Sequence, residues 1–178
     1  EIPLRLVGSE MCIRDSPFFL CGICSRVSAV KISSSVISME RTNVRYITAE
    51  QIPEPLDLAV MDLSFISVKL ILPAVCPLLK DDAEVVCLIK PQFEAGREEV
   101  GKKGVVRDPK VHLEVLESFL AFVPGAGYTV MGLDYSPIKG PEGNIEYLMF
   151  VQKSGEPSVL DDSVAEQVVA ASHSTLDR

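Results

Sequence analysis

Continuous runs of apolar residues recur along the chain and predict strands that are buried on both faces. A short β-branched run covers Ser35–Met39, and longer apolar runs cover Leu56–Asp62 and Glu84–Lys90. Runs that are apolar at nearly every position, rather than at every second one, are typical of parallel strands covered by helices. Two further strands are expected over Tyr128–Tyr135 and Ile145–Gln152.

Helices are expected between these strands. The segment Ser67–Leu79 has helical character but contains Pro73 and Pro77, and its helix could begin at Pro73, because a first turn tolerates proline. A clearer helix follows Asp108, a suitable N-cap before Pro109. Its apolar positions form a helical stripe that ends at a Pro/Gly sequence: Val111, Val115, Leu116, Phe119, Leu120 and Val123.

The order of these elements predicts the fold class. Only nine residues, SPIKGPEGN, join the last two strands, and so short a link without a helix favours antiparallel pairing. The order strand, strand, helix, strand, helix, strand, strand describes an α/β fold, mostly parallel, with one antiparallel edge.

The two ends of the chain differ in pattern from the middle. Residues 1–34 show no sustained period of a strand or of a helix. Residues 154–178 contain five acidic residues against one arginine. We expect them to form an acidic, largely mobile tail with a short helix over Val159–Ala171. The patterned domain is therefore 35–153.

Composition is that of a soluble globular protein. Of the 178 residues 47% are apolar and 24% are charged, which excludes wholesale disorder. Acidic residues outnumber basic ones by 25 to 17, and this balance does not favour a stand-alone nucleic-acid binder. No run approaches the roughly 18 apolar residues of a membrane helix, and no signal sequence is apparent. The five cysteines are scattered, with Cys76 and Cys87 inside apolar runs, so we expect buried thiols in a cytoplasmic protein.

Polar residues at the ends of the expected strands are the first candidates for chemistry. Asp62 ends one strand, Lys90 ends the next, and the loop 136–144 follows a third. In open α/β sheets ligands bind outside the carboxyl ends of the strands. The alternative is that Asp62 and Ser64 form an ordinary turn and that Lys90 only reaches the surface. Position alone leaves both interpretations open.

Other polar features carry less information. The loop 90–110 holds six basic and four acidic residues, so it could contact a polyanion, although a solvated loop is the commoner explanation. Cys21 and Cys24 have C-x-x-C spacing without a second pair, which we interpret as chance. His112 and His173 are isolated in the sequence, and we expect both at the surface.

Four segments together resemble one known family. ERTNVRYIT (40–48), LDLAVMDLSFIS (56–67), LIKPQFEAGREEVGKKGVVRDPKVH (88–112) and SPIKGPEGNIEYL (136–148) are similar to the TlyA, or haemolysin-A, proteins. These are rRNA 2′-O-methyltransferases with an FtsJ-like catalytic domain. The resemblance covers about 35–153. It implies a Rossmann-like methyltransferase sheet, S-adenosylmethionine as methyl donor, and ribosomal RNA or ribosomal subunits as partners.

The resemblance also implies site residues. The family surrounds the ribose hydroxyl with a Lys–Asp–Lys–Glu set, and the motifs match Asp62 to the Asp, Lys90 to the second Lys and Glu146 to the Glu. A lysine can take a proton only if its surroundings lower its pKa, so we expect Lys90 to be central and the two carboxylates to orient it. The residues expected to contact the methyl donor are Asn43, Asp62, Ser64 and Phe65. Those expected to contact RNA are Arg97, Lys103, Arg107 and Lys139.

The chain departs from the family pattern at its N-terminus. Residues 1–34 lack an S4-type RNA-binding domain, an S-R-G-G-x-K segment and a glycine-rich D-I-G-A-S-T-G-G-F loop. LVGSEMCIRDS resembles translated sequencing adapter, so our hypothesis is that residues 1–16 are spurious, that 17–34 are misframed and that the chain is the C-terminal part of a methyltransferase. Weak or absent donor binding and marginal stability are then expected.

Two other functions stay open from the sequence. The chain could be a non-catalytic RNA- or ribosome-binding fragment that uses the loop 90–110. A membrane-active haemolysin, suggested by the family's second name, is less favoured because no basic amphipathic helix is evident.

Overall fold

The computed structural model describes residues 39, 42–52, 54–101, 103–154, 156, 158 and 160–177. Residues 1–34, with Cys12, Cys21 and Cys24, lie outside the described residues. The strand expected over Ser35–Met39 lies outside them too, except for its last residue.

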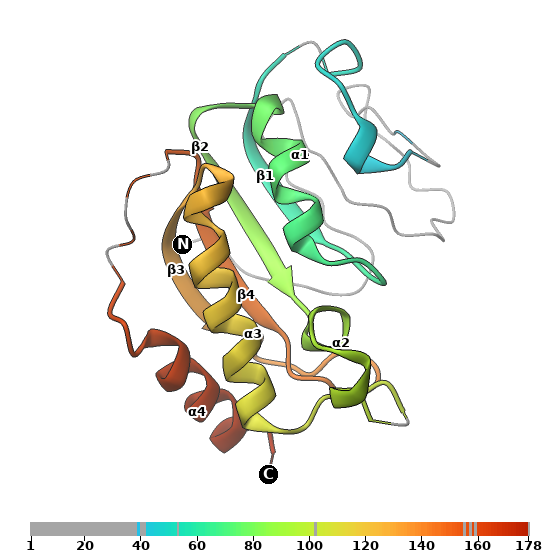
Figure 1. Ribbon diagram of the computed structural model, residues 1–178, viewed down its shortest axis with the longest axis vertical. Coiled ribbons are helices and arrows are strands. Elements are labelled where there is room, and N and C mark those ends of the chain that lie inside the picture. The colour runs from blue at the N-terminus through green and yellow to red at the C-terminus, as the bar shows by residue number, and fades with distance from the viewer. Residues whose placement is uncertain are drawn as a thin grey trace.

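A four-stranded sheet forms the centre of the described fold (Figure 1). Its strands are β1 (Leu56–Asp62), β2 (Leu79–Ile89), β3 (Thr129–Tyr135) and β4 (Tyr147–Gln152). Their order across the sheet is β1-β2-β4-β3, with β1 and β2 parallel and β4 antiparallel to both of its neighbours. The α/β class is confirmed. The antiparallel strand, however, lies inside the described sheet and not at its edge, because β4 pairs with β2 on one side and with β3 on the other.

Strand β2 begins five residues before the expected start. Leu79 and Ala83 are buried, whereas the three residues between them are exposed, and Asp82 has a φ of 63°. The register with β1 shifts here, from Leu56 opposite Leu79 to Leu58 opposite Glu84. An exposed, irregular start of this kind gives no apolar run, so the sequence predicts only the buried part of the strand.

The helices are α1 (Leu72–Val75), α2 (Pro91–Glu94), α3 (Pro109–Phe122) and α4 (Val164–Leu176), with 3₁₀ turns η1 (Val44–Tyr46), η2 (Val68–Leu70), η3 (Cys76–Leu78), η4 (Arg97–Glu99) and η5 (Pro124–Ala126). The expectation for α3 is confirmed, since the Asp108 side chain accepts a hydrogen bond from the Lys110 amide at 2.9 Å and Pro109 begins the helix. The segment Ser67–Leu79 is broken into η2, α1 and η3. Pro73 and Pro77 each lie in the first turn of one piece, where a missing N–H costs no hydrogen bond.

Helix α4 corrects the expectation of a largely mobile tail. It begins five residues after the expected start and continues to Leu176, with Ala165, Val169 and Ser172 buried. These positions recur every three to four residues and pack against α3 and β3. The buried face therefore holds the C-terminal segment on the domain (Figure 1).

Both histidines are also less exposed than expected. His112 is fully buried, because it lies on the side of α3 that carries Val111, Val115 and Leu116. His173 on α4 is half-buried, and its Nε2 is 3.0 Å from Nδ1 of His112. The expectation of two surface histidines is wrong.

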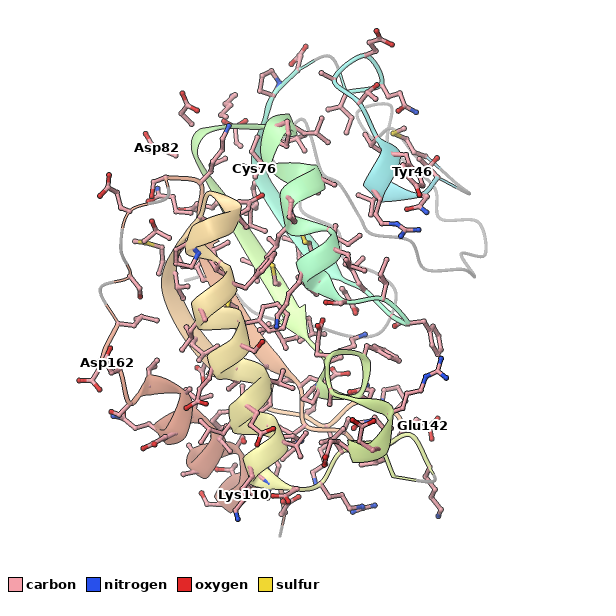
Figure 2. The ribbon with its side chains drawn as sticks, in the orientation of Figure 1. Tyr46, Cys76, Asp82, Lys110, Glu142 and Asp162 are labelled. Carbon is pink, nitrogen blue, oxygen red and sulfur yellow. The ribbon has the colours of Figure 1, made fainter. Side chains whose placement is uncertain are left out.

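The core lies between the sheet and helices α1 and α3, which cover one face of the sheet in Figure 1. Tyr128 is fully buried there and donates a hydrogen bond to the Leu72 carbonyl at 2.8 Å. Of the two described cysteines, Cys87 is buried as expected and Cys76 is partly exposed. In Figure 2, Asp82 near the start of β2 and Glu142 of the loop before β4 lie at opposite ends of the molecule. The rigid sheet thus brings the carboxyl ends of β1 and β2 and the loop 136–144 to the same end.

Candidate active site

An ion pair joins the ends of the two parallel strands. Asp62 is the last residue of β1 and lies opposite Leu88 of β2, two residues before Lys90. Lys90 Nζ is 2.5 Å from Asp62 Oδ1 and donates a hydrogen bond to Ser64 Oγ at 3.3 Å. The Lys90 side chain is only 12% exposed, whereas that of Asp62 is 61% exposed. The structure therefore brings Asp62, Ser64 and Lys90 together and directs the lysine inward, not simply to the surface.

Glu146 is the third charged group at this end of the sheet. The register of β2 and β4 pairs Ile89 with Tyr147, so the next pair beyond it is Lys90 and Glu146. Glu146 is buried, and burial raises the pKa of its carboxyl group. The positive charge of Lys90 opposes this rise in the Glu146 pKa, and the negative charge of Asp62 adds to it. All three residues of the expected set therefore interact electrostatically.

The backbone of the loop 136–144 packs against the Glu146 carboxylate. A Cβ atom on Gly140 would lie 2.7 Å from Glu146 Oε1, so a side chain there would displace the carboxylate from its present position. The Ser136 amide donates to the Glu146 carbonyl at 2.8 Å, and the Gly140 amide donates to the Asn144 carbonyl at 2.9 Å. Gly143, with a φ of 92°, completes the turn. The glycine at position 140 thus leaves room for the buried carboxylate beneath this loop.

Two phenylalanines lie beside the ion pair. Phe65 is 90% exposed and has a φ of 65°, a strained conformation for a bulky residue. Its ring centroid is 4.9 Å from that of Phe93 in α2. Between Phe93 and Lys90 in the chain, Gln92 has a buried side-chain oxygen that finds no hydrogen-bond donor within the described part of the structure. An exposed aromatic face and an unsatisfied acceptor suit a surface that binds a ligand.

Comparison with known proteins places the chain in a family. A model described as FtsJ-like methyltransferase matches residues 25–153, so the match begins ten residues before the resemblance drawn from the motifs. The chain belongs to the FtsJ-like methyltransferase family. The expected relationship to TlyA and haemolysin-A proteins is confirmed by the relatives that follow.

Among curated relatives, YqxC of Bacillus subtilis is 46% identical over 145 residues, which cover 79% of this chain and 52% of YqxC. A Mycobacterium tuberculosis protein named 16S/23S rRNA (cytidine-2′-O)-methyltransferase TlyA is 38% identical over 133 residues, which cover 72% of this chain and 50% of that protein. The chain thus spans about half the length of the curated relatives it matches. A solved structure from Streptococcus thermophilus that bears a hemolysin name is 44% identical, with a TM-score of 0.76 over 82% of this chain and 53% of that one.

Asn43 does not join the ion-paired group of this FtsJ-like domain. It caps η1, where its Oδ1 accepts from the Arg45 backbone amide at 3.2 Å and from Arg45 Nε at 3.3 Å. In Figure 2 the labelled Tyr46 of the same turn lies towards the upper end of the molecule, and the labelled Glu142 lies towards its lower end. No contact links Asn43 to Asp62 or Lys90 within the described ranges, and its role in donor binding stays a prediction.

The four residues expected to contact RNA fall into two groups. Arg97 and Lys103 are exposed on the loop between α2 and α3. Arg107 and Lys139 come from different loops but line one pocket of about 370 Å³. Their roles in RNA binding stay predictions.

Glu94 is a site residue that the sequence analysis missed. Its Oε2 accepts a hydrogen bond from Ser67 Oγ at 2.6 Å, and its Oε1 accepts from the Val68 amide at 2.8 Å. Glu94 ends α2, and Ser67 ends the loop that follows Asp62, so this carboxylate joins the two segments that carry the ion pair. Burial raises the pKa of Glu94, as expected for a carboxyl group removed from water. In the sequence, this role of Glu94 is indicated by its position in the KPQFE motif, which begins with Lys90.

Replacing Glu94 by glutamine is expected to loosen the loop after β1. The amide oxygen of Gln can still accept from Val68, but a hydrogen bond to a carboxylate is about 1 kcal/mol stronger than one to a neutral group. We expect the Val68 amide to exchange with solvent about five times faster in Glu94→Gln. Hydrogen-exchange NMR measures this, with Glu117→Gln on the exposed side of α3 as the control. Equal exchange rates in both variants would contradict the role given to Glu94.

Proposed function

We propose that this protein transfers the methyl group of S-adenosylmethionine to a ribose 2′-hydroxyl of ribosomal RNA. The observation that carries the proposal is the contact of Lys90 with Asp62, 2.5 Å long, beside the buried Glu146. A lysine that interacts with two carboxylates at the carboxyl ends of the strands is suited to hold a weak nucleophile in one orientation. The name of the Mycobacterium tuberculosis relative, 16S/23S rRNA (cytidine-2′-O)-methyltransferase TlyA, supports the same substrate.

The charges of the site fit the methyl donor. S-adenosylmethionine, when bound, supplies an electrophilic methyl group on a positively charged sulfur. Asp62 and Glu146 place two carboxylates around one lysine nitrogen, so the group favours an additional cation. Asp62, Ser64 and Phe65 would hold the donor from the loop after β1, and the unsatisfied Gln92 oxygen is a further acceptor nearby in the chain.

The side chains have different roles towards the ribose hydroxyl group. The 2′-oxygen gains the methyl group and loses its proton, and we assign Lys90 Nζ as the group that accepts that proton. Asp62 and Glu146 hold the lysine nitrogen in place. The backbone around Gly140 covers Glu146 and keeps water away from its carboxylate.

Ribosomal subunits as the partner and the cytoplasm as the location follow from this proposal. The alternatives from the sequence receive less support. Among the described residues, no helix has the length and apolarity needed to cross a membrane.

The test is a methyl-transfer assay with this chain, ribosomal RNA and tritium-labelled S-adenosylmethionine at millimolar concentration, because weak donor binding is expected. Label should enter RNA and, after digestion, be found in 2′-O-methyl nucleosides, while DNA of the same sequence stays unlabelled. RNA binding without transfer would overturn the proposal in favour of a non-catalytic RNA-binding fragment. Leakage of lipid vesicles without transfer would overturn it in favour of a haemolysin.

A further inference from the structure

A pocket of about 370 Å³ lies next to the candidate active site but is not part of it. Three elements form it: the segment before α3, the loop 136–144 and the C-terminal end of α4. Its lining residues are Val106, Arg107, Lys139, Gly143, Ile145, His173 and Asp177. Three of these carry or can carry a positive charge, and one carries a negative charge.

The one carboxylate is bound by the side chains of Lys139 and His173. Asp177 Oδ1 is 2.6 Å from Lys139 Nζ, and Asp177 Oδ2 is 2.6 Å from His173 Nδ1. Two oxygens of one group thus contact two nitrogens from different elements. The same arrangement binds a phosphate group, which presents two oxygens to nitrogen donors in this way.

The position of Asp177 shows that the pocket attracts negative charge. Asp177 follows the last residue of α4, and the C-terminal end of a helix disfavours an anion. The pKa of Asp177 nevertheless lies below its ordinary value, mainly because Lys139 donates a hydrogen bond to its carboxylate. Lys139 and His173 therefore stabilise the charged form of the carboxylate in this pocket.

The pocket and the catalytic group lie on the same loop. Lys139 precedes Gly140, whose missing side chain leaves room for the Glu146 carboxylate, and Ile145 precedes Glu146 itself. In RNA the carbon that bears the 2′-hydroxyl is bonded to the carbon that bears the 3′-phosphodiester. A strand whose ribose reaches Lys90 therefore brings a backbone phosphate to the neighbourhood of this loop.

We infer that Arg107, Lys139 and His173 form a binding site for a backbone phosphate of the RNA substrate, and that the Asp177 carboxylate occupies this site in the free protein. The identity of the ligand as RNA rests on the proposed function. The Lys139–Asp177 pair is partly exposed, and such pairs are weak. A phosphodiester can therefore replace the carboxylate, which moves away with the end of α4.

The test follows the imidazole signals of His173 by NMR while inorganic phosphate or a short single-stranded RNA is added. Asp177→Asn removes the internal competitor and is expected to tighten binding of the RNA about threefold to tenfold. Lys139→Met removes a cation and is expected to weaken it at least as much. Asp57→Asn is the matched control, because Asp57 pairs with Lys80 at the same distance of 2.6 Å and lines no part of this pocket.

The two variants shift the affinity in opposite directions, so a loss of folding cannot produce both results. Equal affinity of Asp177→Asn and the unmodified protein would overturn the inference. A response of His173 to inorganic phosphate but not to RNA would also overturn it, since the site would then take a free anion. Failure of the methyl-transfer assay alone, with the RNA response intact, would count against the proposed function and leave the phosphate site standing.

Discussion

Replacing Lys90 by methionine is expected to lower the rate of methyl transfer about a thousandfold. Methionine keeps the length and the packing of the partly buried stem, but it cannot accept a proton, pair with Asp62 or attract the charge of Glu146. Removal of a general base from an enzyme costs typically a factor of about 10² to 10⁴. Single-turnover transfer of label from S-adenosylmethionine to ribosomal RNA measures the effect.

A second variant distinguishes the role of Lys90 as a proton acceptor from the role of its positive charge. Lys90→Arg keeps a positive charge that can pair with Asp62, but a guanidinium group stays protonated in proteins. If Lys90 accepts the hydroxyl proton, Lys90→Arg is expected to be as inactive as Lys90→Met. An arginine variant within tenfold of the unmodified protein would show that the site needs only the charge.

The control for both variants is Lys80→Met. Lys80 also forms a lysine–aspartate ion pair of 2.6 Å, with Asp57, but near the amino-terminal end of β1. Loss of that exposed pair should change the transfer rate less than twofold, because exposed pairs contribute little to stability. A comparable loss of rate in Lys80→Met would assign the effect of Lys90 to folding.

The parts of the site that could be predicted are those encoded by neighbouring residues. Asp62 and Lys90 each close an apolar run, so the rule that ligands bind at the carboxyl ends of strands makes them candidates, and the family motifs then give them roles. Their contact then follows from the parallel pairing of β1 and β2. Helix α3 was equally clear, because Asp108, Pro109 and the apolar stripe give one consistent signal.

The parts that could not be predicted depend on packing between distant segments. Glu94 and Ser67 are 27 residues apart, and His112 and His173 are 61 residues apart, and no periodicity connects either pair. Asp177 binds Lys139 only because α4 packs on α3, whereas the acidic composition of the last 25 residues favoured a largely mobile tail with a short helix. Charge content alone therefore underestimated the folded part of the chain.

His112 is the buried group whose titration we expect to affect folding most. Its Nε2 donates to the Val106 carbonyl at 3.2 Å, so its Nδ1 is free to accept a hydrogen bond from the Tyr147 hydroxyl at 2.8 Å. Because one ring nitrogen donates and the other accepts, both hydrogen bonds require the neutral imidazole. Burial, helped by His173, lowers the pKa of His112 to about 4, while the nearby Asp177 and Asp108 only partly oppose the shift.

The sign of the pH effect follows from this pKa. An unfolded chain protonates His112 near pH 6.5, whereas the folded protein does so only near pH 4. Between these values the unfolded state binds the additional proton, so the free energy of unfolding falls as the pH decreases. We expect protonation of His112 to lower the free energy of unfolding by about 2 kcal/mol between pH 7.5 and pH 5.

Urea unfolding of the unmodified protein and of His112→Gln at pH 7.5 and pH 5 measures this contribution. Glutamine offers one donor and one acceptor but does not titrate, so the variant should be less stable at pH 7.5 and lose about 2 kcal/mol less on acidification. Carboxylates such as Asp177 titrate in both proteins, and their effect cancels in the difference. Parallel losses in the two proteins would mean that His112 is protonated in the folded state. The network of His112, Tyr147 and His173 would then not depend on a neutral imidazole.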